Sequence, residues 1–221
     1  MPRRSDYRRA VVPPENLLAF TLAALVLIVI PGPSVLFTIG RALALGRTGG
    51  LLSVLGNALG LLPIILLVAL GVGGVVAQSV VLFAIVRIAG AGYLMFLGVQ
   101  AIRHRHRAAT ASASVAPRSH RRQLAEGFTV GVTNPKTIAF FVAVLPQFVD
   151  LDAGAVPLQM IELGLVFFVI ALISDGAWAL AAAAARTWFG RSPKRIATLS
   201  AVGGGMMIGL GGVLLVTGSK H

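Results

Sequence analysis

The sequence of 221 residues contains no cysteine, and only 12% of its residues are charged. The lack of thiols excludes disulfide bonds, thiolate metal sites and thiol redox chemistry. A soluble domain carries about 25% charged residues, whereas this chain carries fewer and is 57% hydrophobic. The composition therefore predicts an integral membrane protein.

Acidic residues are also scarce, since seven Asp and Glu oppose nineteen Lys and Arg and the net charge is +12. In a soluble protein this excess would suggest a nucleic-acid partner. Here the basic side chains lie between apolar runs, where the positive-inside rule of membrane proteins accounts for them. We therefore expect membrane lipid around the chain and no nucleic acid.

Apolar runs of about 20 residues, the length that crosses a bilayer, follow one another along the chain. They predict an all-α, polytopic membrane protein with six transmembrane helices. The predicted spans are residues 16–40, 49–76, 80–102, 126–149, 159–185 and 196–218.

Two polar segments lie outside these spans. Residues 1–15 are expected to form a disordered tail, and not a signal peptide, because the apolar run that follows is too long. Residues 103–125 are expected to form a flexible, basic cytoplasmic linker, whose histidines lie among arginines that repel metal ions. The chain then divides into a first three-helix half, 16–102, and a second, 126–218.

The basic residues are distributed unequally between the two sides of the predicted membrane. The linkers after the first, third and fifth spans hold most of them, and the linkers after the second and fourth spans hold none. The positive-inside rule places the richer side in the cytoplasm, so both termini are predicted to lie outside. The arginines of the N-terminal tail oppose this orientation.

The first span of each half contains a helix-breaking sequence. The two sequences are Pro31-Gly32-Pro33 and Asn134-Pro135-Lys136. Halves of three spans each must be inverted relative to one another, and paired proline or glycine interruptions in corresponding helices indicate the binding site of a transporter. We predict two inverted three-helix halves with the substrate site at the breaks.

In the first break, two prolines flank a glycine. Proline cannot donate the backbone hydrogen bond of a helix, so Pro31 and Pro33 should free the carbonyls of Leu27 and Val29. Gly32 between them allows the helix to open. A simple kink needs only one proline, so this spacing favours a functional break.

The second break places a full positive charge within an apolar span. A charge at the middle of a membrane costs about 3 kcal/mol, and residues with that cost usually mark functional sites. The alternative is that Lys136 extends to an interface and Pro135 only kinks the helix.

An acidic residue, Asp175, lies deep in the fifth span. An ionisable side chain at that depth should face the interior of the bundle. Helical spacing assigns it to a face with Gly164, Phe168, Leu172 and Ala179. The alternative is a structural ion pair without a role in transport.

Depth connects four of the candidate residues. At 1.5 Å per residue, Gly32, Asn57, Lys136 and Asp175 all lie roughly 14–17 Å from the inner surface, near the middle of a ~30 Å core. Lys136 and Asp175 are expected either to pair or to hold the opposite ends of a zwitterion.

The sequence resembles the LysE/RhtB family of bacterial amino-acid exporters over residues 16–217. The strongest segment is GFTVGVTNPKTIAFFVAVLPQFVD at 127–150, supported by Pro31-Gly32-Pro33, by GRALALG at 40–46, by AGAGYLMFLGVQAIR at 89–103 and by Asp175. The resemblance implies six helices in inverted halves, a bacterial inner-membrane location, and efflux of small amino acids or related metabolites driven by the proton gradient. Asn57 is less characteristic of the family.

These observations favour a secondary transporter, because the chain has no nucleotide-binding motif and needs an ion gradient, H⁺ being the expected coupling ion. The predicted substrate-binding residues are Pro31, Gly32, Pro33, Asn57, Asn134, Pro135, Lys136 and Asp175. Export of a metal cation on the same fold is the alternative, and the absence of His and Cys from the spans argues against it. An intramembrane enzyme would need a nucleophile and a base, so we expect no enzyme, cofactor or metal site. A homo-oligomer is compatible with the sequence.

Overall fold

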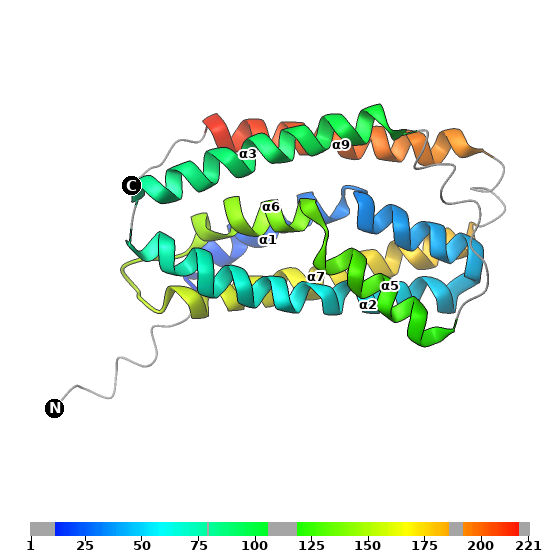
Figure 1. The fold of residues 1–221 in the computed structure, drawn as a ribbon, viewed down its shortest axis with the longest axis horizontal. Coiled ribbons are helices and arrows are strands. Elements are labelled where there is room, and N and C mark those ends of the chain that lie inside the picture. Colours follow the sequence, from blue (N-terminus) through cyan, green and yellow to red (C-terminus); the bar gives the residue numbers. More distant parts are fainter. Residues whose placement is uncertain (1–11, 79, 106–118, 186–191, 217–221) are drawn as a thin grey trace.

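The computed structural model describes residues 12–78, 80–105, 119–185 and 192–216, which form helices joined by short connections, with no strand among them (Figure 1). The helices are α1 (Pro14–Val29), α2 (Pro33–Gln78), α3 (Val80–Arg103), α5 (His120–Val132), α6 (Pro135–Ala143), the 3₁₀ helix η2 (Leu145–Phe148), α7 (Val156–Ala184) and α9 (Pro193–Val216). The expected disordered tail, through residue 11, and the centre of the expected linker, residues 106–118, lie outside the described residues.

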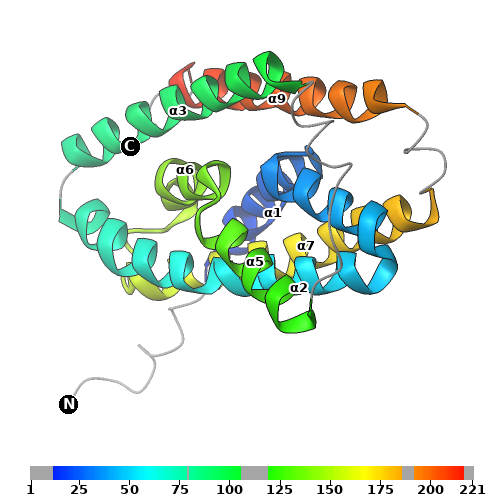
Figure 2. The same ribbon diagram turned by 45° about the vertical axis from the view of Figure 1, so that its right-hand side comes forward.

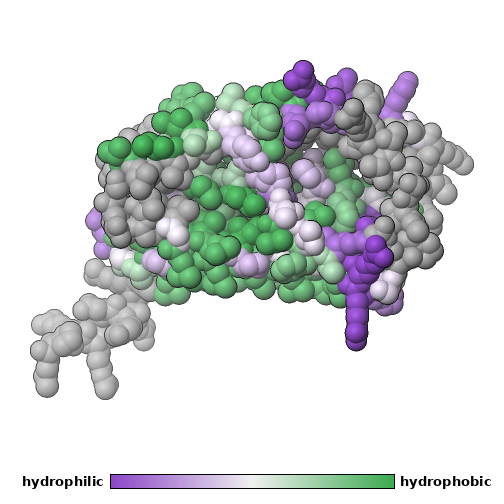
Figure 3. Space-filling model, in the orientation of Figure 1, coloured by the Kyte–Doolittle hydropathy of each residue, from purple (hydrophilic) through white to green (hydrophobic). Residues whose placement is uncertain are grey.

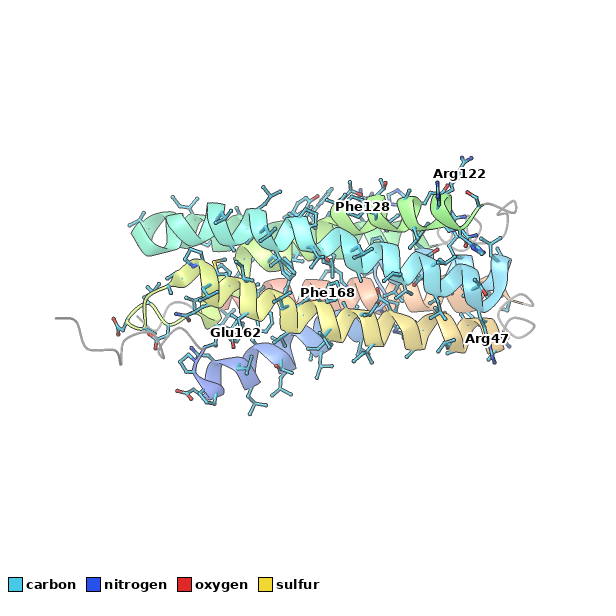
Figure 4. All side chains as sticks on the ribbon, turned by 90° about the horizontal axis from the view of Figure 1, so that it is seen from below. Arg47, Arg122, Phe128, Glu162 and Phe168 are labelled. Atoms are coloured by element: carbon cyan, nitrogen blue, oxygen red, sulfur yellow. The ribbon has the colours of Figure 1, made fainter. Side chains whose placement is uncertain are left out.

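The helices run back and forth along the long axis of the molecule, so that the start of α1 and the end of α9 lie at the same end, on the left of Figure 1. Arg47 and Arg122 lie at the opposite end from Glu162 (Figure 4). Hydrophilic side chains gather at the right-hand end of the surface in Figure 3, beside a broad apolar belt. This distribution suits a protein that spans a membrane.

Length and apolarity alone identify two candidate membrane spans, Val156–Ala184 and Pro33–Gly71, although the second of these contains a non-helical residue, Gly46. A third span results if the bent pair His120–Val132 and Pro135–Phe148, which meet at 41°, counts as one. The first predicted span fails this test because its break leaves α1 only 16 residues long. Six spans therefore stay a prediction, while the all-helical membrane architecture is confirmed.

The helix α2 consists of two arms, residues 33–45 and 47–78, separated by Gly46, where the chain reverses direction (Figure 1). Gly46 has φ 74° and ψ −166°, a conformation that strains residues with a Cβ. The glycine therefore gives the turn between the first and second predicted spans.

Two helix starts differ from the expected boundaries. The helix α5 begins at His120, inside the segment expected to be linker, because the side chain of Ser119 caps it by accepting from the Arg122 N–H. Arg122 also pairs with Glu126 one turn later, at 3.1 Å. At the N-terminal end, α1 starts at Pro14, where proline suits the first turn of a helix.

Aromatic side chains join α1, α6 and α7 in the main core. The ring centroid of Phe140 lies 5.9 Å from that of Phe20 and 5.4 Å from that of Phe167, and Phe141 meets Phe167 edge-on at 4.8 Å. All four side chains are buried. This core fixes the position of α6, and therefore of the second break, against α1 and α7.

Glycines allow the second arm of α2 to lie directly against α5. A Cβ at Gly56 or Gly60 would stand 2.2 or 2.5 Å from a carbonyl oxygen of α5, and one at Gly131 would stand 2.2 Å from the Asn57 carbonyl oxygen. Glycines four residues apart, such as Gly56 and Gly60, permit this close approach of a neighbouring helix. The contact holds the backbone of Asn57 beside the break between α5 and α6.

Replacing Gly60 with alanine is expected to lower the free energy of unfolding by about 1–3 kcal/mol, because the new Cβ meets backbone that cannot easily move. The matched control is Gly71→Ala in the same arm, since a Cβ there has no neighbour within 4 Å. The measurement is thermal unfolding of both purified variants in one detergent. Equal stability of the two would contradict the close packing.

The helices α3 and α9 form a layer of their own beside the remaining helices (Figures 1 and 2). They pack on one another at Gly211, where a Cβ would lie 2.5 Å from Met95 and 2.7 Å from the carbonyl oxygen of Ala91. Contacts from both helices attach the pair to the rest of the described molecule. The helix α3 contacts α6, and Ala197 of α9 packs against Leu36 and Leu43 in the first arm of α2.

Candidate functional site

The two helix breaks meet in the interior. In the first, α1 ends at Val29 and α2 begins at Pro33, while in the second α6 begins at Pro135. The side-chain amide of Asn134 donates to the hydroxyl of Ser34 at 3.1 Å, and its oxygen caps α6 by accepting from the backbone N–H of Lys136. The starts of α2 and α6 are therefore joined by a side-chain hydrogen bond between Asn134 and Ser34.

Lys136 crosses from the second break to the first. Its ammonium nitrogen lies 2.8 Å from both the Leu27 and Ile30 carbonyl oxygens, and the residue is only 3% exposed. Leu27 has this acceptor free because Pro31 has no N–H to donate to it. The second acceptor is the carbonyl of Ile30 and not that of Val29, which Pro33 was expected to free. Ile30 leaves the helix with ψ 117°, so its carbonyl points away from the helix axis.

The position of the ammonium agrees with elementary electrostatics. The carbonyl end of a helix carries a partial negative charge that favours a cation, and α1 ends where Lys136 binds. Gly32 leaves the necessary room, because a Cβ there would lie 3.0 Å from Cδ and 3.1 Å from Nζ of Lys136. The alternative that Lys136 extends to an interface does not describe this buried side chain.

Asp175 of α7 binds Asn57 from the second arm of α2. The amide nitrogen of Asn57 donates to the carboxylate at 3.0 Å, and the two residues are 4% and 3% exposed. The amide oxygen of Asn57 is buried and has no hydrogen-bond partner among the described residues. The site therefore retains a carboxylate and a vacant acceptor, both of which suit an additional donor group.

The buried face of α7 includes Asp175 and Ala179 as expected, together with Gly164. Phe168 and Leu172 are only partly buried, and their neighbours Phe167 and Ala171 occupy the buried positions instead. The reason is that α7 is apolar on all sides, so the sequence gives no amphipathic pattern from which to choose the face.

Lys136 and Asp175 do not form a direct ion pair in the part of the chain that the structure describes. Each is held by neutral groups, the ammonium by carbonyls and the carboxylate by Asn57. The bundle interior thus contains a cation and an anion with no hydrogen bond between them.

The predicted site residues form two neighbouring groups. The first is the pair of breaks, with Pro31, Gly32, Pro33, Asn134, Pro135 and Lys136, and the second is Asn57 with Asp175. The prolines contribute through the backbone, since Pro33 is exposed and Pro135 partly buried. Whether any of these residues binds a substrate stays a prediction.

Sequence reasoning missed Ser34 and the partly buried ion pair of Arg41 and Glu126. Ser34 directly follows the first break, and a small polar residue at a helix start is a usable signal for capping. The guanidinium of Arg41 binds the carboxylate of Glu126 and lies 5.0 Å from the ring centre of Phe37. This pair joins the first arm of α2 to α5 near the basic end of the molecule.

No cluster of three His, Asp or Glu side chains that could hold a metal ion occurs within the described ranges. The polar groups of the site are instead carbonyls, amides, one carboxylate and one ammonium. Groups of these kinds can form hydrogen bonds with both ends of a small charged organic molecule.

Comparison with known proteins identifies the family. A model of the LysE type translocator family matches residues 25–218, which confirms the resemblance seen in the sequence. A membrane protein of Vibrio cholerae is 35% identical over 90% of this chain and 96% of its own length. A leucine efflux protein of Klebsiella pneumoniae is 32% identical over 71% of each chain. No solved structure matches the chain significantly. The chain therefore belongs to the LysE-type translocator family of membrane proteins.

Proposed function

We propose that this protein is a secondary transporter that exports neutral amino acids through the site where the two helix breaks meet. The observation that carries the proposal is that a cation, Lys136, and an anion, Asp175, are both buried in the helix bundle with no hydrogen bond between them. An amino acid carries one ammonium and one carboxylate, so it complements both charges. The leucine efflux protein of Klebsiella pneumoniae, as a relative, supports this substrate class.

In the proposed complex, Asp175 and the free amide oxygen of Asn57 receive the substrate ammonium or, at another stage, a coupling proton. Lys136 faces the substrate carboxylate. A lysine ammonium has three N–H donors, and Leu27 and Ile30 take two of them. The third donor and the backbone N–H groups at a half-helix start would bind the carboxylate.

A neutral side chain fits this charge balance best. The site residues supply one positive and one negative charge, and each would be matched by one end of a zwitterion. A second charge on the substrate would enter the interior without a partner, which is costly. Export of a free metal cation is disfavoured in addition by the ammonium of Lys136 and by the lack of a metal-binding cluster in the described ranges.

The proposed mechanism has two inverted three-helix halves and coupling to the proton gradient. Two contacts that correspond to one another in the two halves support inversion. The helix after the first break, the first arm of α2, contacts α9, the last helix of the second half. The helix after the second break, α6, likewise contacts α3, the last helix of the first half. Alternating access would then move one half against the other around the breaks.

The function is tested by uptake into inverted membrane vesicles with an acidic interior, against a panel of labelled amino acids. We expect uptake of leucine, competition by other neutral aliphatic amino acids, and little effect of lysine or glutamate. Vesicles that carry the Asp175→Asn variant at equal protein level are the control. Absence of uptake for every amino acid, or uptake confined to charged ones, would contradict the proposal.

We propose that the protein lies in the bacterial inner membrane with both termini outside and the basic end in the cytoplasm. Because the chain has no cysteine, single cysteines report it cleanly. In whole cells, an impermeant thiol reagent is expected to label Asp152→Cys and to leave Arg121→Cys unlabelled until the cells are opened. Both positions are exposed. Arg121 is next to Arg122, and Asp152 lies in the turn before α7, the helix whose first turns hold Glu162 at the opposite end of the molecule (Figure 4). The reverse labelling would overturn the orientation.

A further inference from the structure

The end of α1 presents two carbonyl oxygens to one point in the interior. Pro31 deprives the Leu27 carbonyl of its helical donor, and Ile30 turns its own carbonyl out of the helix. Both oxygens lie 2.8 Å from the same nitrogen of Lys136. Converging carbonyls at the C-terminal end of a broken helix are the arrangement with which other transporters bind a coupling cation.

We infer that the Leu27 and Ile30 carbonyls form a monovalent-cation site that the ammonium of Lys136 fills in place of an inorganic ion. The cation is supplied by the chain itself, from the other half of the molecule and 109 residues away from Leu27. At this position the protein needs neither Na⁺ nor K⁺. Two of the three N–H donors of Lys136 thus tie α6 to the end of α1, and the third stays available for the substrate contact proposed above.

Three features support a site made for a primary ammonium. The distances to both oxygens are those of charge-assisted hydrogen bonds. Gly32 leaves room where a Cβ would come within 3.3 Å of the lysine side chain. The acceptors belong to the negative end of the α1 dipole. The inference does not depend on which substrate is transported, so stability can test it separately from export.

The test is chemical rescue of a lysine-truncated variant. Lys136→Ala removes the atoms of an n-propylammonium ion and leaves the two carbonyls without their donor. We expect its unfolding temperature in detergent to fall by about 5–10 °C. Added n-propylammonium should restore at least half of this loss. Uncharged n-propanol, which has the same chain, should restore little.

Two controls separate the site from general salt effects. Lys194→Ala removes an exposed lysine and should show neither the loss nor the rescue. The wild-type protein should unfold at the same temperature in sodium, potassium and choline chloride, and this measurement remains informative if Lys136→Ala does not fold.

The inference fails if Lys136→Ala is as stable as the wild type, if no added cation restores its lost stability, or if the wild type is stabilised specifically by Na⁺ or K⁺. Because the readout is unfolding, these results are distinct from the export results. A protein that shows the rescue but exports no amino acid would keep the cation site and lose the proposed function.

Discussion

Asp175→Asn is expected to reduce amino-acid export by about 30-fold or more, because it removes the anionic group of the site at almost constant size. In the proposed complex Asp175 forms a buried, hydrogen-bonded charge pair with the substrate ammonium, and truncating one member of such a pair costs about 2–5 kcal/mol, which is the basis of this magnitude. The asparagine can still accept the hydrogen bond that Asn57 donates to Asp175, so the fold should persist. The measurement is uptake into inverted vesicles, normalised to folded protein.

The control for Asp175→Asn is Asp152→Asn, which removes an exposed acidic charge from the turn before α7 and should leave export unchanged.

Lys136→Met keeps the apolar length of the lysine side chain and removes its charge. It should weaken substrate binding more than Asp152→Asn does.

A double variant distinguishes a binding site from a structural charge pair. If Lys136 and Asp175 only neutralise one another, then Asp175→Asn together with Lys136→Met should recover export, because neither charge is left alone. If they hold the two ends of the substrate, the double variant should be as inactive as the worse single variant. Recovery of export would therefore reject the proposed substrate contacts.

Replacing Pro31 and Pro33 together with alanine is expected to lower export at least tenfold while leaving insertion intact. Alanine restores the backbone donors, so the helix can continue from α1 into α2. The Leu27 carbonyl would then be taken by its own helix and lost to Lys136. The measurement is again vesicle uptake, with the unfolding temperature of the same preparation.

Pro63→Ala is the matched control for these substitutions, because Pro63 lies inside the second arm of α2 and not at a break. It should leave export close to the wild-type rate. Wild-type export by a folded Pro31→Ala/Pro33→Ala variant would show that the first break serves only packing.

The site residues were predictable from sequence where a residue has a high free-energy cost in the hydrocarbon core of a membrane. A charge or a proline within an apolar span costs free energy, so Lys136, Asp175 and both breaks stand out without any homologue. Gly56 and Gly60 form a local pattern of the same kind, because glycines four residues apart permit a close helix contact, and the structure has this contact with α5.

The partners of these residues were not predictable in the same way. Asn57 and Asp175 are 118 residues apart in the chain, and Ser34 and Asn134 are 100 apart. Such contacts depend on how the helices pack, and no local pattern encodes them. Depth along the spans placed Gly32, Lys136, Asn57 and Asp175 at one level, but it could not tell that Lys136 binds α1 carbonyls instead of Asp175.

The separate α3–α9 layer has a consequence for synthesis in the cell. The main described partner of α3 is α9, the last helix of the described chain. About 90 residues separate Arg103 from Pro193, and a ribosome that adds about 5–20 residues per second needs about 5–20 s for them. During that interval, lipid or a membrane chaperone must cover the face of α3 on which α9 later packs. The surface of α3 is apolar, with Ile85, Ile88 and Phe96 exposed even in the complete fold, so contact with lipid suits it before α9 is made.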